Sequence, residues 1–163
     1  MDRLFSPWRY TYVTRDEKKS TGCVFCSALE TEDGRALTLL TGTTCFVILN
    51  LYPYNSGHLM IVPRRHVGTL AALDDVELAE IGQWTQRAEM ALTEAYQPQG
   101  INVGMNLGRP AGAGVLDHLH VHVVPRRRKD GLKGFFWPRN KYQNEAEMLR
   151  VQEAIQLAIT SLT

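Results

Sequence analysis

Apolar residues recur at two spacings along the chain, and each spacing predicts a different kind of element. Short β-prone runs at 45–49 and 58–63 flank the turn-forming segment Tyr52-Pro-Tyr-Asn-Ser-Gly57. Such a pattern is typical of an antiparallel hairpin with a wide turn. A further strand is expected at 101–106, and another where histidines alternate with Leu119 and Val121.

Helical spacing appears in two other parts of the chain. Asp74 with Glu77 three residues later forms the pattern of a capping box, and apolar residues then follow with helical period until Pro98 and Gly100. Residues 145–162 have the same period and predict a C-terminal helix.

These elements predict an α+β fold, in which a long helix and a C-terminal helix pack on the apolar face of an antiparallel β-sheet. We expect one domain over 1–163, with an aromatic-rich N-terminal arm at 1–22.

Composition and charge say little about which kinds of molecule this protein binds. Eighteen basic residues against 17 acidic ones argue neither for nor against an anionic partner. We expect no nucleic-acid partner. Basic residues cluster locally at 126–129, either as a solvated loop or to attract phosphate. No apolar run has membrane-spanning length, the first residues lack the apolar centre of a signal peptide, and three cysteines do not suit a disulfide framework. We therefore expect a cytoplasmic protein with no membrane partner.

Three of the five histidines lie within five residues, at His118, His120 and His122. On a strand, alternate residues share a face, so three imidazoles would form one row. Such a row can transfer protons, ligate a metal or attack phosphorus, and a neutral imidazole is a competent nucleophile near pH 7. His120 lies between the other two histidines, and this middle position favours it as the attacking group. The glycine-rich loop 108–114 just before it offers backbone N–H groups to phosphate.

Cys23 and Cys26 form a Cys-x-x-Cys pair, whose thiolates can reach one metal ion. A redox pair and two small core residues are the alternatives. Cys45 lies in an apolar run and is expected in the core.

The run His118-Leu-His-Val-His-Val-Val124 matches the signature of the histidine triad (HIT) family of nucleotide hydrolases and transferases. The likeness extends over residues 4–126, including the block from Asn50 to His66 and the loop from Asn106 to Gly114. The arm at 4–12 resembles bacterial members near the diadenosine polyphosphate hydrolases and phosphorylases. The resemblance implies a HIT-like fold and a homodimer formed by joining the sheets of two copies.

The resemblance also implies roles for individual residues. His120 would be the nucleophile that becomes nucleotidylated. His122 would hydrogen-bond the α-phosphate or the leaving oxygen, and His58 would orient the triad from behind.

Nucleotide binding would fall to four other positions. Asn50 would hold the ribose hydroxyls, and Asn106 with Gly112 and Gly114 would lie beside the phosphates. Gly114 stands where many members have Gln or Ser, so that contact must come from backbone amides or from elsewhere.

Some bacterial members bind a structural zinc ion, and the matching ligands here are Cys23, Cys26, His66 and His118. This Cys₂His₂ set would be closed and not catalytic.

The resemblance thus implies cleavage of a dinucleoside polyphosphate, or a related nucleotide conjugate, at the α-phosphate through a nucleotidyl-histidine. The acceptor would be water, or phosphate as in a phosphorylase. Two other readings stay open: a catalytic metal held by all three triad histidines, and a zinc-stabilised nucleotide-binding module without turnover. The aromatic insert around Phe135, Phe136 and Trp137 would cap the substrate or form dimer surface.

Overall fold

A computed structural model describes residues 22–130 and 145–161. The aromatic arm and the insert that contains Phe135 to Trp137 lie outside the described residues. The helices are α2 (Val24–Ala28), α3 (Glu32–Leu37), α4 (Asp75–Tyr96) and α5 (Glu145–Ser161), with short 3₁₀ turns at Leu70–Ala72, Arg109–Ala111 and Arg128–Asp130. The strands are β1 (Thr38–Thr41), β2 (Cys45–Leu49), β3 (Leu59–Pro63), β4 (Gly100–Gly104) and β5 (Val121–Arg126).

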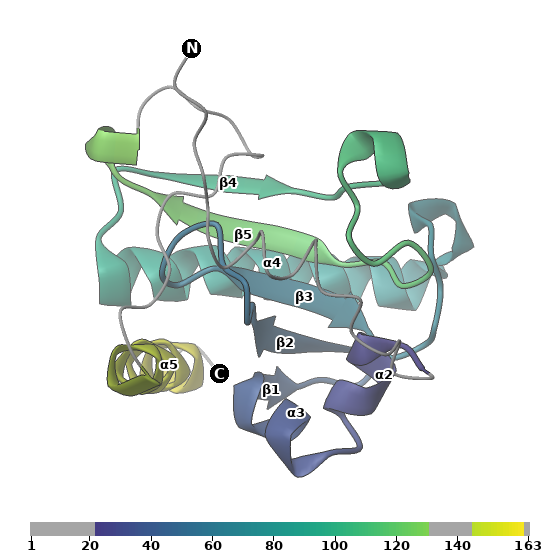
Figure 1. Ribbon diagram of the computed structural model, residues 1–163, viewed down its shortest axis with the longest axis horizontal. Coiled ribbons are helices and arrows are strands. Elements are labelled where there is room, and N and C mark those ends of the chain that lie inside the picture. Colours follow the sequence, from purple (N-terminus) through teal and green to yellow (C-terminus); the bar gives the residue numbers. More distant parts are fainter. Residues whose placement is uncertain (1–21, 131–144, 162–163) are drawn as a thin grey trace.

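The five strands form one antiparallel sheet in the order β1-β2-β3-β5-β4, as Figure 1 shows. The predicted hairpin is confirmed, since β2 and β3 pair from Cys45 opposite Pro63 to Leu49 opposite Leu59. The predicted α+β architecture is likewise confirmed.

The long helix α4 begins as the sequence predicts. The Asp74 carboxylate accepts a hydrogen bond from the Glu77 backbone, and the Glu77 carboxylate accepts one from the Asp74 backbone. The helix ends at Tyr96, after which Gln97 adopts a left-handed conformation ahead of Pro98.

The main core lies between one face of the sheet and the helices α4 and α5 (Figure 1). Leu59, Ile61, Val121 and Val123 point into it from β3 and β5. The opposite face carries a smaller apolar cluster made by α2 and the strands, which consists of Phe25, Ala28, Phe46, Ile48, Met60 and Val62. The short helices α2 and α3 were not predicted, and they give this second face a cover of its own.

The histidine strand is shorter than predicted. β5 begins at Val121, so only His122 of the three histidines lies within it. The Leu119 N–H donates to the carbonyl of Val67 (2.6 Å), so this part of the chain pairs with the loop after β3 instead of continuing the ladder. His118 therefore approaches that loop, which carries His66.

Candidate active site and metal site

His122 lies opposite Met60 in the β3–β5 ladder, on the sheet face that α2 covers. It is 4 % exposed, and its Nδ1 lies 2.9 Å from Nε2 of the fully buried His58. The backbone N–H of Tyr54 donates to His58 Nδ1 (3.1 Å), so the proton of a neutral His58 sits on Nε2 and is donated to His122. A neutral His122 consequently carries its own proton on Nε2.

Burial lowers the pKa of His58 well below its ordinary value, and the neighbouring His122 and Arg126 lower it further. His58 therefore stays neutral at pH 7. The Tyr54 ring stacks on it at 4.8 Å between centroids, which restricts how the imidazole can turn.

His120 has the opposite tautomer from His122. Its Nδ1 lies 2.9 Å from the carbonyl oxygen of His118, an acceptor, so the proton sits on Nδ1 and the lone pair on Nε2. Burial lowers the pKa of His120, although the bond to that carbonyl partly opposes the effect. The result is a neutral imidazole whose free lone pair can attack an electrophile, 4.7 Å between centroids from the proton-bearing His122.

A cavity of ≈ 390 Å³ opens in front of these two histidines. Its polar lining includes the substrate-binding residues expected from the sequence, namely Asn50, Asn106, Gly112 and Gly114, together with His120 and His122. Its remaining walls are largely apolar, with Val24, Phe25, Leu37, Ile48 and Val115 among the residues. An apolar pocket with a few convergent polar groups is typical of a small-molecule site.

The loop beside the cavity needs glycine at two positions. Gly108 and Gly112 have φ of 84° and 90°, a region that L side chains rarely adopt. Asn106 is 7 % exposed. Asn50 is half-buried, and its Oδ1 accepts a hydrogen bond from the Tyr52 backbone (2.8 Å), so it also stabilises the turn that follows β2.

Next to this cavity, the structure brings together the four predicted metal ligands. One ligand atom each from Cys23, Cys26, His66 and His118 lies within 4.8 Å of all the others. His118 Nδ1 is 3.1 Å from Cys23 Sγ and 3.6 Å from Cys26 Sγ, and His66 Nδ1 is 3.4 Å from Cys26 Sγ. Ligands of tetrahedral zinc stand about 3.3 to 3.8 Å apart, so this group has the compactness of a metal site.

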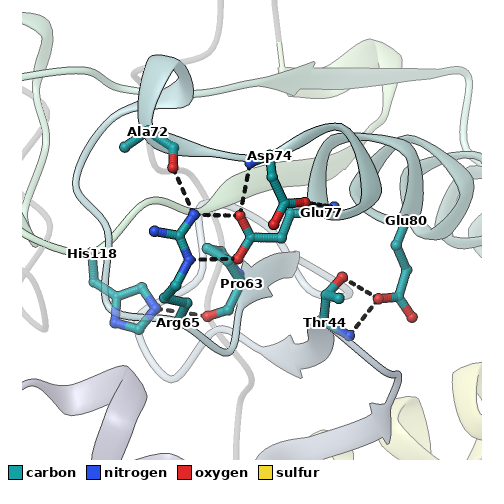
Figure 2. A network of polar contacts seen from close by, with 8 residues as sticks. All are labelled: Thr44, Pro63, Arg65, Ala72, Asp74, Glu77, Glu80 and His118. Atoms are coloured by element: carbon teal, nitrogen blue, oxygen red, sulfur yellow. Dashed lines mark hydrogen bonds and ion pairs between the residues drawn. The ribbon is translucent and has the colours of Figure 1, made fainter.

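The tautomer of His118 also suits a ligand. Its Nε2 lies 2.8 Å from the carbonyl oxygen of Pro63 (Figure 2), so Nε2 holds the proton. Nδ1 therefore offers its lone pair toward the thiols of Cys23 and Cys26. Burial lowers the pKa of His118, which favours the neutral form that can ligate. Burial and the adjacent Cys23 raise the pKa of the Cys26 thiol, an effect that a bound cation would reverse.

The first turn of α4 supports the loop that carries His66. Figure 2 shows the Glu77 carboxylate bound by Arg65 through two nitrogens, at 2.9 and 2.6 Å. Arg65 also donates to the carbonyl of Ala72 (2.6 Å). Arg65 lies between Pro63 and His66, so this ion pair fixes the backbone on both sides of it.

The three triad histidines do not converge on one point. His118 faces the cysteines, the Nδ1 of His120 binds a backbone carbonyl, and the Nδ1 of His122 faces His58. The reading in which all three hold a catalytic metal is therefore wrong for this geometry. Cys45 is fully buried in the main core, as predicted, where burial and then Glu80 raise its pKa to about 12.

Sequence reasoning missed three contributors to the site. The Tyr54 backbone and the Pro63 carbonyl set histidine tautomers, and main-chain contacts of this kind leave no residue-type signal. Phe25 packs against both His118 and His120, at 5.4 and 5.0 Å between centroids. Its place between the two cysteines was visible, but its partners 93 and 95 residues later were not.

Within the ranges that the structure describes, no helix is both long enough and apolar enough to cross a membrane.

Comparison with known proteins identifies the family of this chain. The sequence model of the HIT domain family matches residues 35–129 of this chain. A protein of Mycobacterium tuberculosis named AP-4-A phosphorylase is 42% identical over 133 residues, which cover 77% of this chain and 68% of that protein.

Two solved structures share the fold. A hypothetical histidine triad nucleotide-binding protein from Sulfolobus tokodaii is 28% identical with a TM-score of 0.71, covering 86% of this chain and 93% of that one. A zinc-bound histidine triad family protein from Mycobacterium smegmatis is 27% identical with a TM-score of 0.69, covering 86% of this chain and 95% of that one. This chain is therefore a member of the histidine triad family.

Proposed function

We propose that this protein is a HIT enzyme that cleaves a dinucleoside polyphosphate, or a related nucleotide conjugate, at the α-phosphorus through a nucleotidyl-histidine on His120. One observation carries the proposal: His120 and His122 line the same cavity with opposite tautomers, one offering a lone pair and the other a proton. A nucleophile next to an acid is what displacement at phosphorus requires. The name of the M. tuberculosis relative supports the substrate class.

In the first step, His120 Nε2 would attack the α-phosphorus and form the P–N bond while the bond to the bridging oxygen breaks. The His118 carbonyl accepts the bond from His120 Nδ1 and would stabilise the positive charge that develops on the ring. His122 Nε2–H would donate to the α-phosphate or to the departing oxygen. Positions of Asn50, Asn106, Gly112 and Gly114 around the cavity support their roles in holding ribose and phosphates.

In the second step, an acceptor would attack the same phosphorus and release His120. Water would yield a nucleoside monophosphate, whereas inorganic phosphate would yield a nucleoside diphosphate. The relative's name favours phosphate, so we propose phosphorolysis as the first activity to assay and hydrolysis as the second.

The test combines adduct trapping with product analysis. Purified protein is mixed with diadenosine tetraphosphate and quenched with base, and the intact mass is measured. We expect an acid-labile adenylyl adduct in the native chain and none in His120→Ala. Products are then compared with and without inorganic phosphate. Binding of nucleotide with neither adduct nor product would support instead the module without turnover.

We further propose that the Cys23, Cys26, His66 and His118 cluster binds a structural zinc ion. The compact donor set and the zinc-bound relative support this. Zinc would join α2 to the segment before β5, and four protein ligands would leave no position for a reacting water. Metal analysis of the native chain and of Cys26→Ser tests it: about one zinc per native chain is expected, with less zinc and a lower Tm in the variant.

The remaining expectations are part of the same proposal. β4 is an edge strand of the described sheet, which supports a homodimer in which two copies join their sheets through it. A thiolate-bound zinc needs reduced cysteines, which supports a cytoplasmic location. Sedimentation of the purified protein would test the dimer.

A further inference from the structure

The five-residue helix α2 borders both the metal site and the cavity. Cys23 is its N-cap and Cys26 lies within it, while Val24, Phe25, Ser27 and Ala28 of the same helix line the cavity wall. A helix of this length is not stable by itself, so its position depends on what it contacts. A ligand that fixes α2 at the metal site would therefore also fix the part of the cavity wall that α2 forms.

Phe25 is the residue of α2 that contacts both halves of the site. Its side chain is 5 % exposed, and its ring meets His118 edge-on (5.4 Å, 73°) and lies tilted against His120 (5.0 Å, 46°). Phe25 also belongs to the cluster on the second face of the sheet, together with Phe46 and Met60. One buried ring thus separates a metal ligand from the proposed nucleophile.

We propose that Phe25 is a positioning residue that couples metal binding at Cys23, Cys26, His66 and His118 to nucleotide binding in the adjacent cavity. The inference deepens the proposed function and rests on it. Zinc would fix α2 through the two thiolates and would thereby stabilise the packing of Phe25 on His120 and the apolar wall of the cavity. A nucleotide that fills the cavity would in turn hold α2 against the metal ligands.

Coupling of this kind is reciprocal, because both ligands favour the same placement of α2. A nucleotide that binds more tightly in the presence of zinc must increase the affinity for zinc by the same factor. The effect can therefore be measured on the zinc side, without any turnover.

A second route between the sites exists in the backbone. His118 and His120 are two residues apart, and His120 Nδ1 donates to the carbonyl of His118. If this segment carried the coupling, truncation of Phe25 would leave it unchanged. Substitution of Phe25 therefore distinguishes the two routes.

The experiment uses the full-length, zinc-loaded protein and AMP as the nucleotide. The dissociation constant of zinc is measured by competition with a chromophoric chelator, with and without saturating AMP. We expect AMP to lower it about tenfold in the native chain, within the range usual for coupled sites. In Phe25→Ala the factor should fall below about twofold, and in Phe25→Leu, which keeps part of the apolar bulk, to about threefold.

Ile155→Ala is the matched control. Ile155 is fully buried in the main core on α5, so its truncation lowers stability without touching α2 or the cavity. It should keep the full tenfold factor, because a general loss of stability does not change the coupling between two sites.

The outcomes separate the two proposals. If calorimetry shows that AMP binds but the zinc constant does not change, the coupling is overturned and the proposed function stands. If Phe25→Leu keeps the native factor, the role of Phe25 is overturned, even where Phe25→Ala does not fold. If AMP does not bind and His120 forms no adduct, both proposals fail.

Discussion

The two faces of β3 and β5 differ in what they bury. Toward α4 and α5, Leu59, Ile61, Val121 and Val123 pack in a continuous apolar core. Toward α2, Met60 lies opposite His122, and His120 lies just before the first residue of β5. Adjacent residues of one segment thus serve stability and chemistry separately. This separation is possible because successive side chains of an extended chain point to opposite faces of the sheet.

The largest expected effect is that of His120→Ala. Removal of the proposed nucleophile should lower kcat/KM by about 10⁴-fold or more, because no other group would form the covalent intermediate. The variant loses the ring that packs on Phe25 but keeps the main core, so Tm should fall by no more than about 5 °C. Steady-state kinetics and calorimetry on the same sample check both values. Unchanged turnover would remove His120 from the mechanism.

The matched change on the other face is Ile61→Ala. Ile61 is fully buried opposite Val121, and its truncation should lower the free energy of unfolding by about 3 kcal/mol. Activity per folded molecule should stay within about threefold of the native value. Urea unfolding and active-site titration measure the two quantities. A loss of activity much larger than the loss of stability would show that the faces are not independent.

His58→Ala should have a smaller effect on rate than loss of the nucleophile. His58 selects the tautomer of His122 but does not itself line the cavity, so we expect kcat to fall about 10- to 100-fold. His58→Gln offers an acceptor for the Tyr54 N–H and a donor for His122, and it should recover part of the loss. Equal activities for the two variants would contradict orientation by hydrogen bonding.

The smallest effect is expected for Glu77→Gln, which keeps a side-chain oxygen for the Asp74 backbone and removes the charge that binds Arg65. Because Arg65 is half exposed, we expect only a small loss in the free energy of unfolding at pH 7, well below that of Ile61→Ala. The hydrogen bond from Arg65 lowers the pKa of Glu77 in the folded state. The advantage of the native chain is therefore complete above the ordinary pKa of Glu and disappears as the pH falls through the lowered value. Denaturant unfolding of both proteins from pH 7 to pH 3 measures this.

The sequence predicted best those elements whose signal is local. The capping box at Asp74 and the β2–β3 hairpin depend on neighbouring residues, and both are confirmed. The predicted start of the histidine strand was wrong. Leu119 pairs with Val67, which is distant in the sequence, and a periodic pattern cannot reveal that contact.

For the site, residue types were readable but their partners were not. The resemblance to a family brought Cys23, Cys26, His66 and His118 into one set, and the structure brings their ligand atoms together. The tautomers depend on main-chain atoms and on a turn at Tyr54, which only three-dimensional contacts define.

The carbonyl of Pro63 that holds Nε2 of His118 belongs to the main chain. Every amino acid brings the same oxygen, so no exchange of side chain at position 63 can delete the acceptor itself. The tautomer of this proposed zinc ligand therefore depends on the path of the backbone, and it would survive substitutions that would abolish a carboxylate partner. Only an insertion or deletion that slides the end of β3 past the histidines would take it away.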